Sequence, residues 1–146
     1  MAALLRLPLF LLLMGVMSAS MIVPAAYALA IDAFHDARSF FYSGLLGLIL
    51  TTFLSFATAN RRDATTALRQ LAAILGAFAF LPVILAVPFF EAVRTTTFLS
   101  AYFEMVSAFT TTGATLFAPE RLSGPEHLWR AQVGWMGGLI IWVAAS

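Results

Sequence analysis

Residues 107–117 read SAFTTTGATLF and lie between two strongly apolar segments of the chain. Their position predicts a location at membrane depth, yet the centre of the stretch, residues 110–115, consists of four threonines, one glycine and one alanine. This composition makes a poor lipid-facing helix. Irregular backbone at that depth is tolerated only where protein buries it or where it lines a water-filled cavity. Two interpretations of the stretch are therefore open, a pore-lining segment and a Thr-rich surface loop.

The composition around this stretch predicts an integral membrane protein. Of the 146 residues, 62% are hydrophobic and only 10% are charged, whereas soluble domains carry about 25% charged residues. The absence of cysteine excludes disulfides, thiol catalysis and cysteine metal sites. The net charge of +1 gives no nucleic-acid footprint. No nucleotide motif or catalytic triad is present, so we expect neither an enzyme nor a covalently bound cofactor. His35 and His127 are far apart in polar segments and are expected to be solvated.

Four apolar runs indicate membrane spans, since a helix needs about 20 apolar residues to cross a bilayer. The first run could instead be a cleaved signal peptide, with Arg6 as its basic region and Ala28-Leu29-Ala30 as its cleavage site. Its apolar part is longer than the usual core of about 7–15 residues, which favours a retained helix. The fourth run is still apolar at Ser146, so we expect the chain to be part of a longer polypeptide. The runs cover residues 7–30, 40–59, 68–90 and 128 onward.

A shorter apolar segment, residues 98–109, precedes the threonine stretch. As a helix it would be about 18 Å long, which is too short to span and fits a re-entrant segment. Thr97 is a candidate N-cap for it. The third run contains Pro82 and Pro88, which indicates packing against protein, because neighbouring helices commonly satisfy the backbone groups freed by proline.

These segments predict an all-α membrane protein with two parts. An N-terminal transmembrane hairpin covers residues 1–63, and one helix–pore helix–filter–helix repeat, its last helix truncated, covers residues 64–146. The arginines divide equally between the two sides, but Arg61 and Arg62 lie in a very short loop, where the positive-inside rule is most reliable. We therefore place the N-terminus in the cytoplasm, so that residues 110–115 descend from the outer face.

The chemistry of residues 110–115 fits a cation filter. Gly113 permits backbone angles closed to other residues, and a column of aligned carbonyls can replace the hydration shell of a cation. Threonine hydroxyls can add oxygen ligands, and the C-terminal end of the short helix carries partial negative charge that favours a cation. The TTTG sequence alone is a weak signal. The layout of span, half-helix, polar stretch and span favours the filter over a surface loop.

Three stretches resemble the Trk/Ktr/HKT superfamily of cation transporters, most closely its TrkH type. Residues 101–109 resemble the first pore helix of that family, residues 110–115 its first filter, and residues 128–138, with their WxGG sequence, the start of the following helix. Family members carry four such repeats around one axis. The resemblance implies that this chain contributes one of four filter segments to a potassium pore.

The resemblance also implies roles for individual residues. Backbone carbonyls of Thr111, Thr112, Gly113 and Ala114 would coordinate K⁺, which is the transported ion. In this superfamily a serine in place of the filter glycine goes with sodium permeation, so Gly113 favours potassium. The remaining two threonines would frame the filter; they are Thr110 and Thr115.

Expected partners follow from the same resemblance. They are the remaining repeats of the full-length chain, a cytosolic nucleotide-binding regulatory subunit, a second copy in a homodimer, and the lipid bilayer of the bacterial inner membrane. The alternative is a non-transporting four-span anchoring or assembly subunit. The coding sequence beyond Ser146 would discriminate between the two, because only a transporter would continue with three more filter segments.

Further residues have open roles. Glu104, at membrane depth, would tune the field of the ion path or, the interpretation we favour, accept structural hydrogen bonds behind the filter. Arg130 would pair with Glu104 or Glu126, or extend to the interface. Gly137-Gly138 indicate close helix packing rather than a hinge. Trp129 is predicted to be an interfacial anchor. A group of acids would concentrate cations at the mouth or solvate loops: Asp32, Asp36, Glu91, Glu120 and Glu126.

Overall fold

A computed structural model describes residues 9–58 and 67–145, and within these ranges all regular structure is helical. The predicted charged turn at 60–63 lies outside the described residues, as do Arg6 and the expected boundary between residues 63 and 64. The described helices are α1 (Leu9–Ser20), α2 (Ile22–Ala30), α3 (Phe34–Thr58), α4 (Ala67–Val93), α5 (Phe98–Phe109), the short 3₁₀ helix η2 (Pro119–Arg121) and α6 (Gly124–Ala145).

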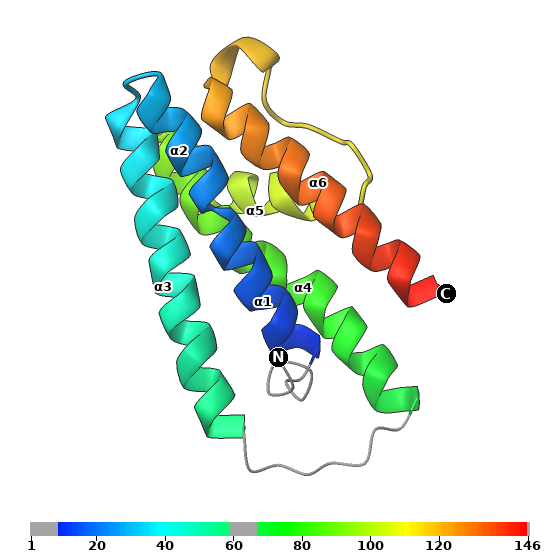
Figure 1. The fold of residues 1–146 in the computed structure, drawn as a ribbon. Helices are drawn as coiled ribbons and strands as arrows, with labels where there is room; N and C mark the ends of the chain where they lie inside the picture. The colour runs from blue at the N-terminus through cyan, green and yellow to red at the C-terminus, as the bar shows by residue number, and fades with distance from the viewer. Residues whose placement is uncertain (1–8, 59–66, 146) are drawn as a thin grey trace.

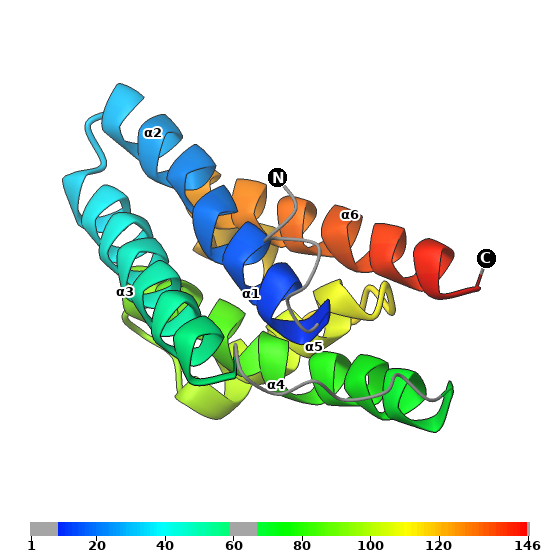
Figure 2. The same cartoon turned by 60° about the horizontal axis from the view of Figure 1, so that its bottom comes forward.

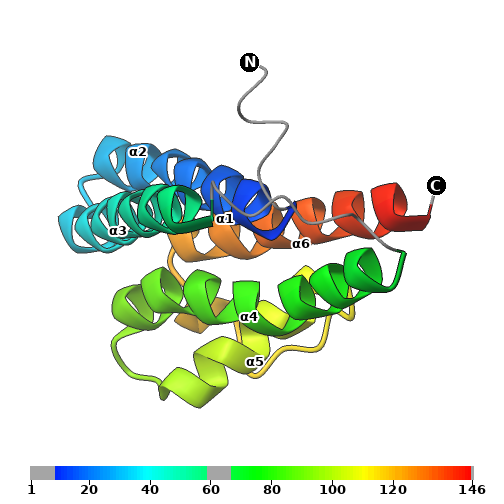
Figure 3. The same cartoon turned by 90° about the horizontal axis from the view of Figure 1, so that it is seen from below.

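The helices form two layers (Figure 3). The first layer contains α1 and α2, which follow one another almost in line, together with α3 and α6; the second contains α4 and α5 (Figures 1 and 2). Among the residues that the structure describes, three segments are long and apolar enough to cross a membrane, namely residues 10–30, 34–58 and 75–93, which supports an integral membrane protein. The 22-residue helix α6, predicted as a fourth span, is not among them.

The start of the second span differs from the one indicated by its apolar run. Helix α3 begins at Phe34 and not near residue 40, so only residues 31–33 remain outside the helices between α2 and α3. Asp36 lies in the first turn of α3, where the helix dipole favours an acid. By contrast, α5 has the bounds predicted from the sequence, and Thr97 caps it: its Oγ1 accepts a hydrogen bond from the Ser100 amide at 3.2 Å.

The first span is broken at Met21, although the sequence indicates one continuous helix. The break follows from Pro24, which has no backbone N–H to donate to the carbonyl four residues earlier. That carbonyl belongs to Ser20, the last residue of α1. Pro24 therefore divides the span into α1 and α2 and leaves one acceptor at the division.

The N-terminal hairpin is held by close contact between small residues of α1 and α3. A Cβ at Gly44 would lie 2.9 Å from the Ser18 carbonyl oxygen, and one at Gly47 would overlap Ser18 Oγ. In membranes, helices associate largely through such close packing, because lipid is as apolar as their side chains. The two glycines thus allow α3 to approach α1 almost backbone to backbone.

Trp129 is not the interfacial anchor that the sequence suggests. It is fully buried, packs edge-on against Phe40 with ring centroids 5.8 Å apart, and donates from Nε1 to the Leu85 carbonyl at 3.1 Å. Leu85 lies three residues before Pro88, one of the two prolines inside α4. Likewise, Tyr102 Oη donates at 3.2 Å to the carbonyl of Ala79, three residues before Pro82. Neighbouring helices therefore do pack on the proline-containing helix, as predicted.

Candidate functional site: the stretch after the half-helix

Helix α5 ends in a backbone turn that starts the threonine stretch. The Thr112 amide donates to the Ser107 carbonyl at 2.9 Å, and the Thr111 amide donates to the Ala108 carbonyl at 3.0 Å. This pair of bonds is a Schellman motif, which satisfies the last carbonyls of a helix and needs a left-handed residue after the C-cap. The motif turns the chain out of α5 at Thr110 and sends it toward η2 in irregular conformation.

The left-handed position of this motif is a threonine. Thr111 has φ +57°, a region that β-branched residues rarely adopt. From the sequence, unusual backbone angles were expected at Gly113 only. Gly113 does have φ +77°, so its predicted conformational role is confirmed. Thr111 was missed, and the signal that could have found it is its position, two residues after the predicted end of the short helix at residue 109.

Positive φ therefore alternates along the stretch: it occurs at Thr111 and Gly113 and not at Thr112. In such an alternation successive N–H groups converge on one side of the chain. Because each carbonyl points opposite to its N–H across a trans peptide, the oxygens tend toward the other side. Within the described residues no hydrogen bond reaches the carbonyl oxygens of Thr111, Thr112 or Gly113.

Ala114 differs from the other predicted carbonyl ligands. Its carbonyl oxygen accepts a hydrogen bond from Ser107 Oγ at 2.6 Å, which ties the stretch back to α5. Ser107 is itself buried on α5, whereas residues 111–116 are all exposed in this chain. The structure thus gives Ala114 a structural contact that sequence reasoning did not anticipate.

The hydroxyls of Thr110 and Thr115 are used locally. Thr110 Oγ1 donates to the Val106 carbonyl at 2.8 Å and lies 2.8 Å from Thr112 Oγ1. Thr115 Oγ1 accepts from the Phe117 amide at 3.2 Å. Each threonine therefore stabilises the backbone at one end of the stretch.

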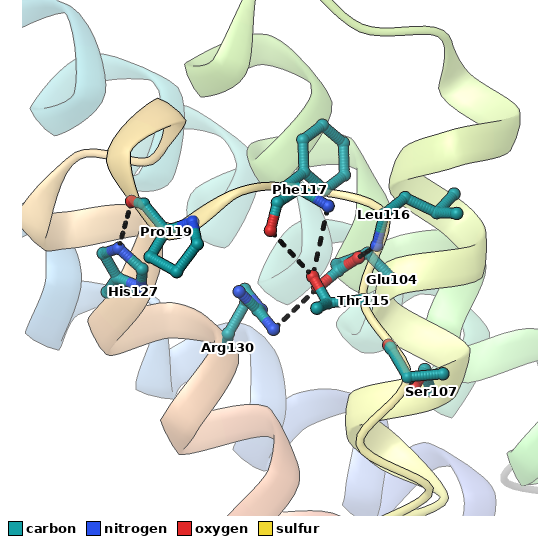
Figure 4. A network of polar contacts seen from close by, with 9 residues as sticks. Glu104, Ser107, Thr115, Leu116, Phe117, Pro119, His127 and Arg130 are labelled. Carbon is teal, nitrogen blue, oxygen red and sulfur yellow. Dashed lines mark hydrogen bonds and ion pairs between the residues drawn. The ribbon is translucent and has the colours of Figure 1, made fainter.

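Glu104 and Arg130 meet behind the far end of the stretch (Figure 4). Glu104 is 1% exposed, and its Oε1 lies 2.8 Å from Arg130 Nη2, while its Oε2 accepts from the Leu116 amide at 3.0 Å. One carboxylate thus joins α5, α6 and the stretch. Between the roles considered for Glu104, these contacts fit the structural acceptor.

Glu126, the other acid considered for Arg130, is engaged elsewhere. Its Oε2 accepts from the Ser123 amide at 2.7 Å, and Ser123 Oγ donates to Asp36 Oδ2 at 2.7 Å. Burial raises the pKa of Glu126, and the nearby carboxylate of Asp36 raises it further, while the bond from the Ser123 backbone opposes the shift. Two of the acids expected at the mouth are therefore buried and fasten the start of α6 to α3. The other three are exposed: Asp32, Glu91 and Glu120.

Glycines of α6 allow the C-terminal end of α5 to pack closely against α6. A Cβ at Gly137 would overlap the carbonyl oxygen of Phe109 and lie 2.6 Å from its carbonyl carbon. A Cβ at Gly134 would lie 3.4 Å from the Ala108 carbonyl oxygen, and one at Gly138 would lie 3.6 Å from Thr111 Cγ2. The predicted close packing is confirmed, with Gly137 as the position that sterically requires glycine.

A shallow cavity of about 340 Å³ lies beside the far end of the stretch. Four of its seven lining residues carry hydroxyl groups, and Arg121, another of them, donates from Nη2 to the Thr95 carbonyl at 3.1 Å. The cavity connects the start of α5 with the end of the stretch. Its lining residues are Thr95, Thr96, Thr97, Ser100, Leu116, Phe117 and Arg121.

The two histidines make separate contacts, one between α3 and α4 and one between α6 and η2. His35 Nε2 lies 2.8 Å from the Glu91 carbonyl oxygen, and His127 Nε2 lies 2.9 Å from that of Pro119. In the part of the chain that the structure describes, no three His, Cys, Asp or Glu residues are grouped to hold a metal ion.

Comparison of the chain with protein-family models, with curated proteins and with solved structures found no match. A function is therefore inferred from the geometry of the stretch and from the resemblance of its sequence.

Proposed function

We propose that this chain is the N-terminal part of a potassium uptake transporter of the Trk/Ktr/HKT type, and that residues 110–115 form one of four filter segments around a cation pore. The protein would reside in the bacterial inner membrane with its N-terminus in the cytoplasm. It would work with the remaining repeats, a second copy and a cytosolic nucleotide-binding subunit, as the resemblance implies.

The observation that carries this proposal is the run of three carbonyl oxygens after a half-length helix. The oxygens of Thr111, Thr112 and Gly113 receive no hydrogen bond from the described residues, and φ alternates in sign along them. Backbone of this kind at membrane depth needs a watery cavity or a ligand. A dehydrated monovalent cation meets that need, because carbonyl oxygens can replace its water shell.

Selectivity for K⁺ rests on Gly113. No atom lies within 4 Å of a Cβ built there, so a side chain would act through backbone strain at φ +77° and not through a clash. A non-glycine residue in this region costs about 1–2 kcal/mol. That energy is enough to shift the local backbone and with it the spacing of the oxygens.

The test is growth rescue of a host that lacks potassium uptake, using the complete coding sequence that contains this chain. We expect the wild type to restore growth at low K⁺ and Gly113→Ser to lose the preference for K⁺ over Na⁺. Gly76→Ser is a matched control, because Gly76 lies in helix α4 with no atom within 4 Å of a Cβ and no positive φ.

Two results would contradict the proposal. Absence of rescue by an expressed wild type would favour the anchoring or assembly subunit, and an unchanged ion preference in Gly113→Ser would remove the filter assignment.

A further inference from the structure

Helix α6 lies between the N-terminal hairpin and the end of α5. On one side Gln132 Nε2 donates to the Ser20 carbonyl at 2.9 Å. On the other side Gly137 receives the Phe109 carbonyl. The two residues are five positions apart, so they lie about 140° apart around the helix. Helix α6 therefore contacts both the hairpin and the residue that precedes the threonine stretch, so a shift of one can displace the other.

The acceptor that Gln132 uses is the one created by Pro24. Ser20 lies four residues before Pro24, so its carbonyl lacks the helical donor that any other residue at 24 would supply. An unsatisfied carbonyl in an apolar environment is costly. The amide of Gln132 replaces the missing N–H, and it comes from another helix.

The side-chain N–H group of Gln132 makes a hydrogen bond, whereas its side-chain oxygen does not, so the N–H group explains why a glutamine is present. Gln132 Oε1 is buried and accepts no hydrogen bond from the described residues. A buried acceptor without a partner costs free energy, and a leucine of similar size would avoid that cost. The bond to Ser20 is the contact that offsets it.

We propose that Gln132 is a positioning residue for the ion filter. Its bond to Ser20 holds α6 against the hairpin in the register in which Gly137 accommodates Phe109, and through Phe109 it fixes Thr111. The inference rests on the proposed function, because a filter must exist in order to be positioned. It assigns the N-terminal hairpin a part in ion selectivity.

The experiment is a double-mutant cycle in the complete polypeptide, with Gln132→Leu, Pro24→Ala and the two combined. Two quantities are measured, the melting temperature in detergent and the ratio of K⁺ to Na⁺ uptake in cells. Pro24→Ala returns a backbone N–H to the Ser20 carbonyl, so Gln132 is no longer needed there. Ala131→Leu is the control, because Ala131 is the exposed neighbour on the same helix.

We expect Gln132→Leu to lower the melting temperature by about 3–6 °C. We also expect it to lower the K⁺/Na⁺ uptake ratio by about fivefold, the factor that corresponds to one ordinary hydrogen bond. In the Pro24→Ala background both effects should fall below half, and Ala131→Leu should leave both quantities unchanged.

Each adverse result has a distinct meaning. Uptake by the wild type with an unchanged ratio in Gln132→Leu overturns the positioning role alone, even if the melting temperature falls. No uptake by the expressed wild type overturns the proposed function, and the positioning role with it. If Gln132→Leu does not accumulate in the membrane, the combined variant should restore its yield, and failure to do so overturns the inference.

Discussion

The two ends of the stretch after α5 are held by different kinds of interaction. At the near end, Thr111 and Thr112 are fixed by backbone hydrogen bonds of the Schellman motif, and the close approach of Gly137 to Phe109 holds the end of α5. At the far end, the Leu116 amide is held by the buried carboxylate of Glu104, which Arg130 neutralises. The near end is thus held in place by close packing and backbone conformation, and the far end is held by charged side chains.

This difference indicates which substitutions each end tolerates. A buried ion pair is sensitive to the loss of either partner, because the remaining charge is left uncompensated. A backbone contact is indifferent to charge but sensitive to a single methyl group. Gly113 lies between the two ends, and its amide still reaches the Ser107 carbonyl oxygen at 3.4 Å, the acceptor that the Thr112 amide also uses, so the backbone contacts of the near end extend as far as Gly113.

The largest effect is expected from Arg130→Gln, which leaves the Glu104 carboxylate buried without its cation. Breaking one side of a buried pair costs about 3–5 kcal/mol, measured as a lower free energy of unfolding in detergent. The control is Glu104→Gln combined with Arg130→Gln, because a glutamine at 104 can still accept from the Leu116 amide. Equal destabilisation in the single and combined variants would show that charge is not what matters at the far end.

Gly137→Ala should destabilise the near end by about 3 kcal/mol, since its Cβ would overlap the Phe109 carbonyl and overpacking forces the backbone to shift. Thermal unfolding in detergent measures this loss. Gly138→Ala is the matched control, because its Cβ would make an ordinary contact at 3.6 Å. It should be neutral or slightly stabilising, as Ala is the better helix former. A loss of similar size in both variants would contradict the steric explanation.

The smallest effect, and one of opposite sign, is expected from Thr111→Gly. Glycine adopts φ +57° without the Cβ penalty, so the free energy of unfolding should rise by about 1 kcal/mol. Chemical or thermal denaturation of the two proteins side by side measures the difference. Thr112→Gly, at a position without positive φ, should instead destabilise. If Thr111→Gly also destabilises, the threonine side chain contributes more than its backbone strain costs.

The sequence predicts the helices better than it predicts how they meet. Apolar length gives the spans, and the polar cap at Thr97 gives the start of α5, because both depend on local residues. The break at Met21 was missed because the apolar run gives no sign of it; it depends on Pro24 near the start of α2 and on a hydrogen bond from α6 to the Ser20 carbonyl. Trp129 was misassigned for a related reason: its partner, the Leu85 carbonyl, is distant in sequence.

The candidate site shows the same division. Gly113 and Gly137 could be identified because glycine usually marks either unusual backbone angles or close packing. The pairing of Glu104 with Arg130 was one of the two ion pairs considered for that arginine. The hydrogen bond from Ser107 to Ala114 and the left-handed Thr111 were not anticipated, since serine and threonine are compatible with many environments. Those contacts depend on where the chain leaves the helix.

The dependence of α5 on α6 has a consequence for biosynthesis. The 12 residues of α5 are too few to be released into lipid as a span, and the glycines that seat it are translated after it. We therefore expect the half-helix to stay exposed to water until α6 has been synthesised and packs against it. A Ser107→Cys chain ending at residue 123 should react with a water-soluble thiol reagent, and the chain that includes α6 should be protected. Equal labelling of both would show that α5 finds its place unaided.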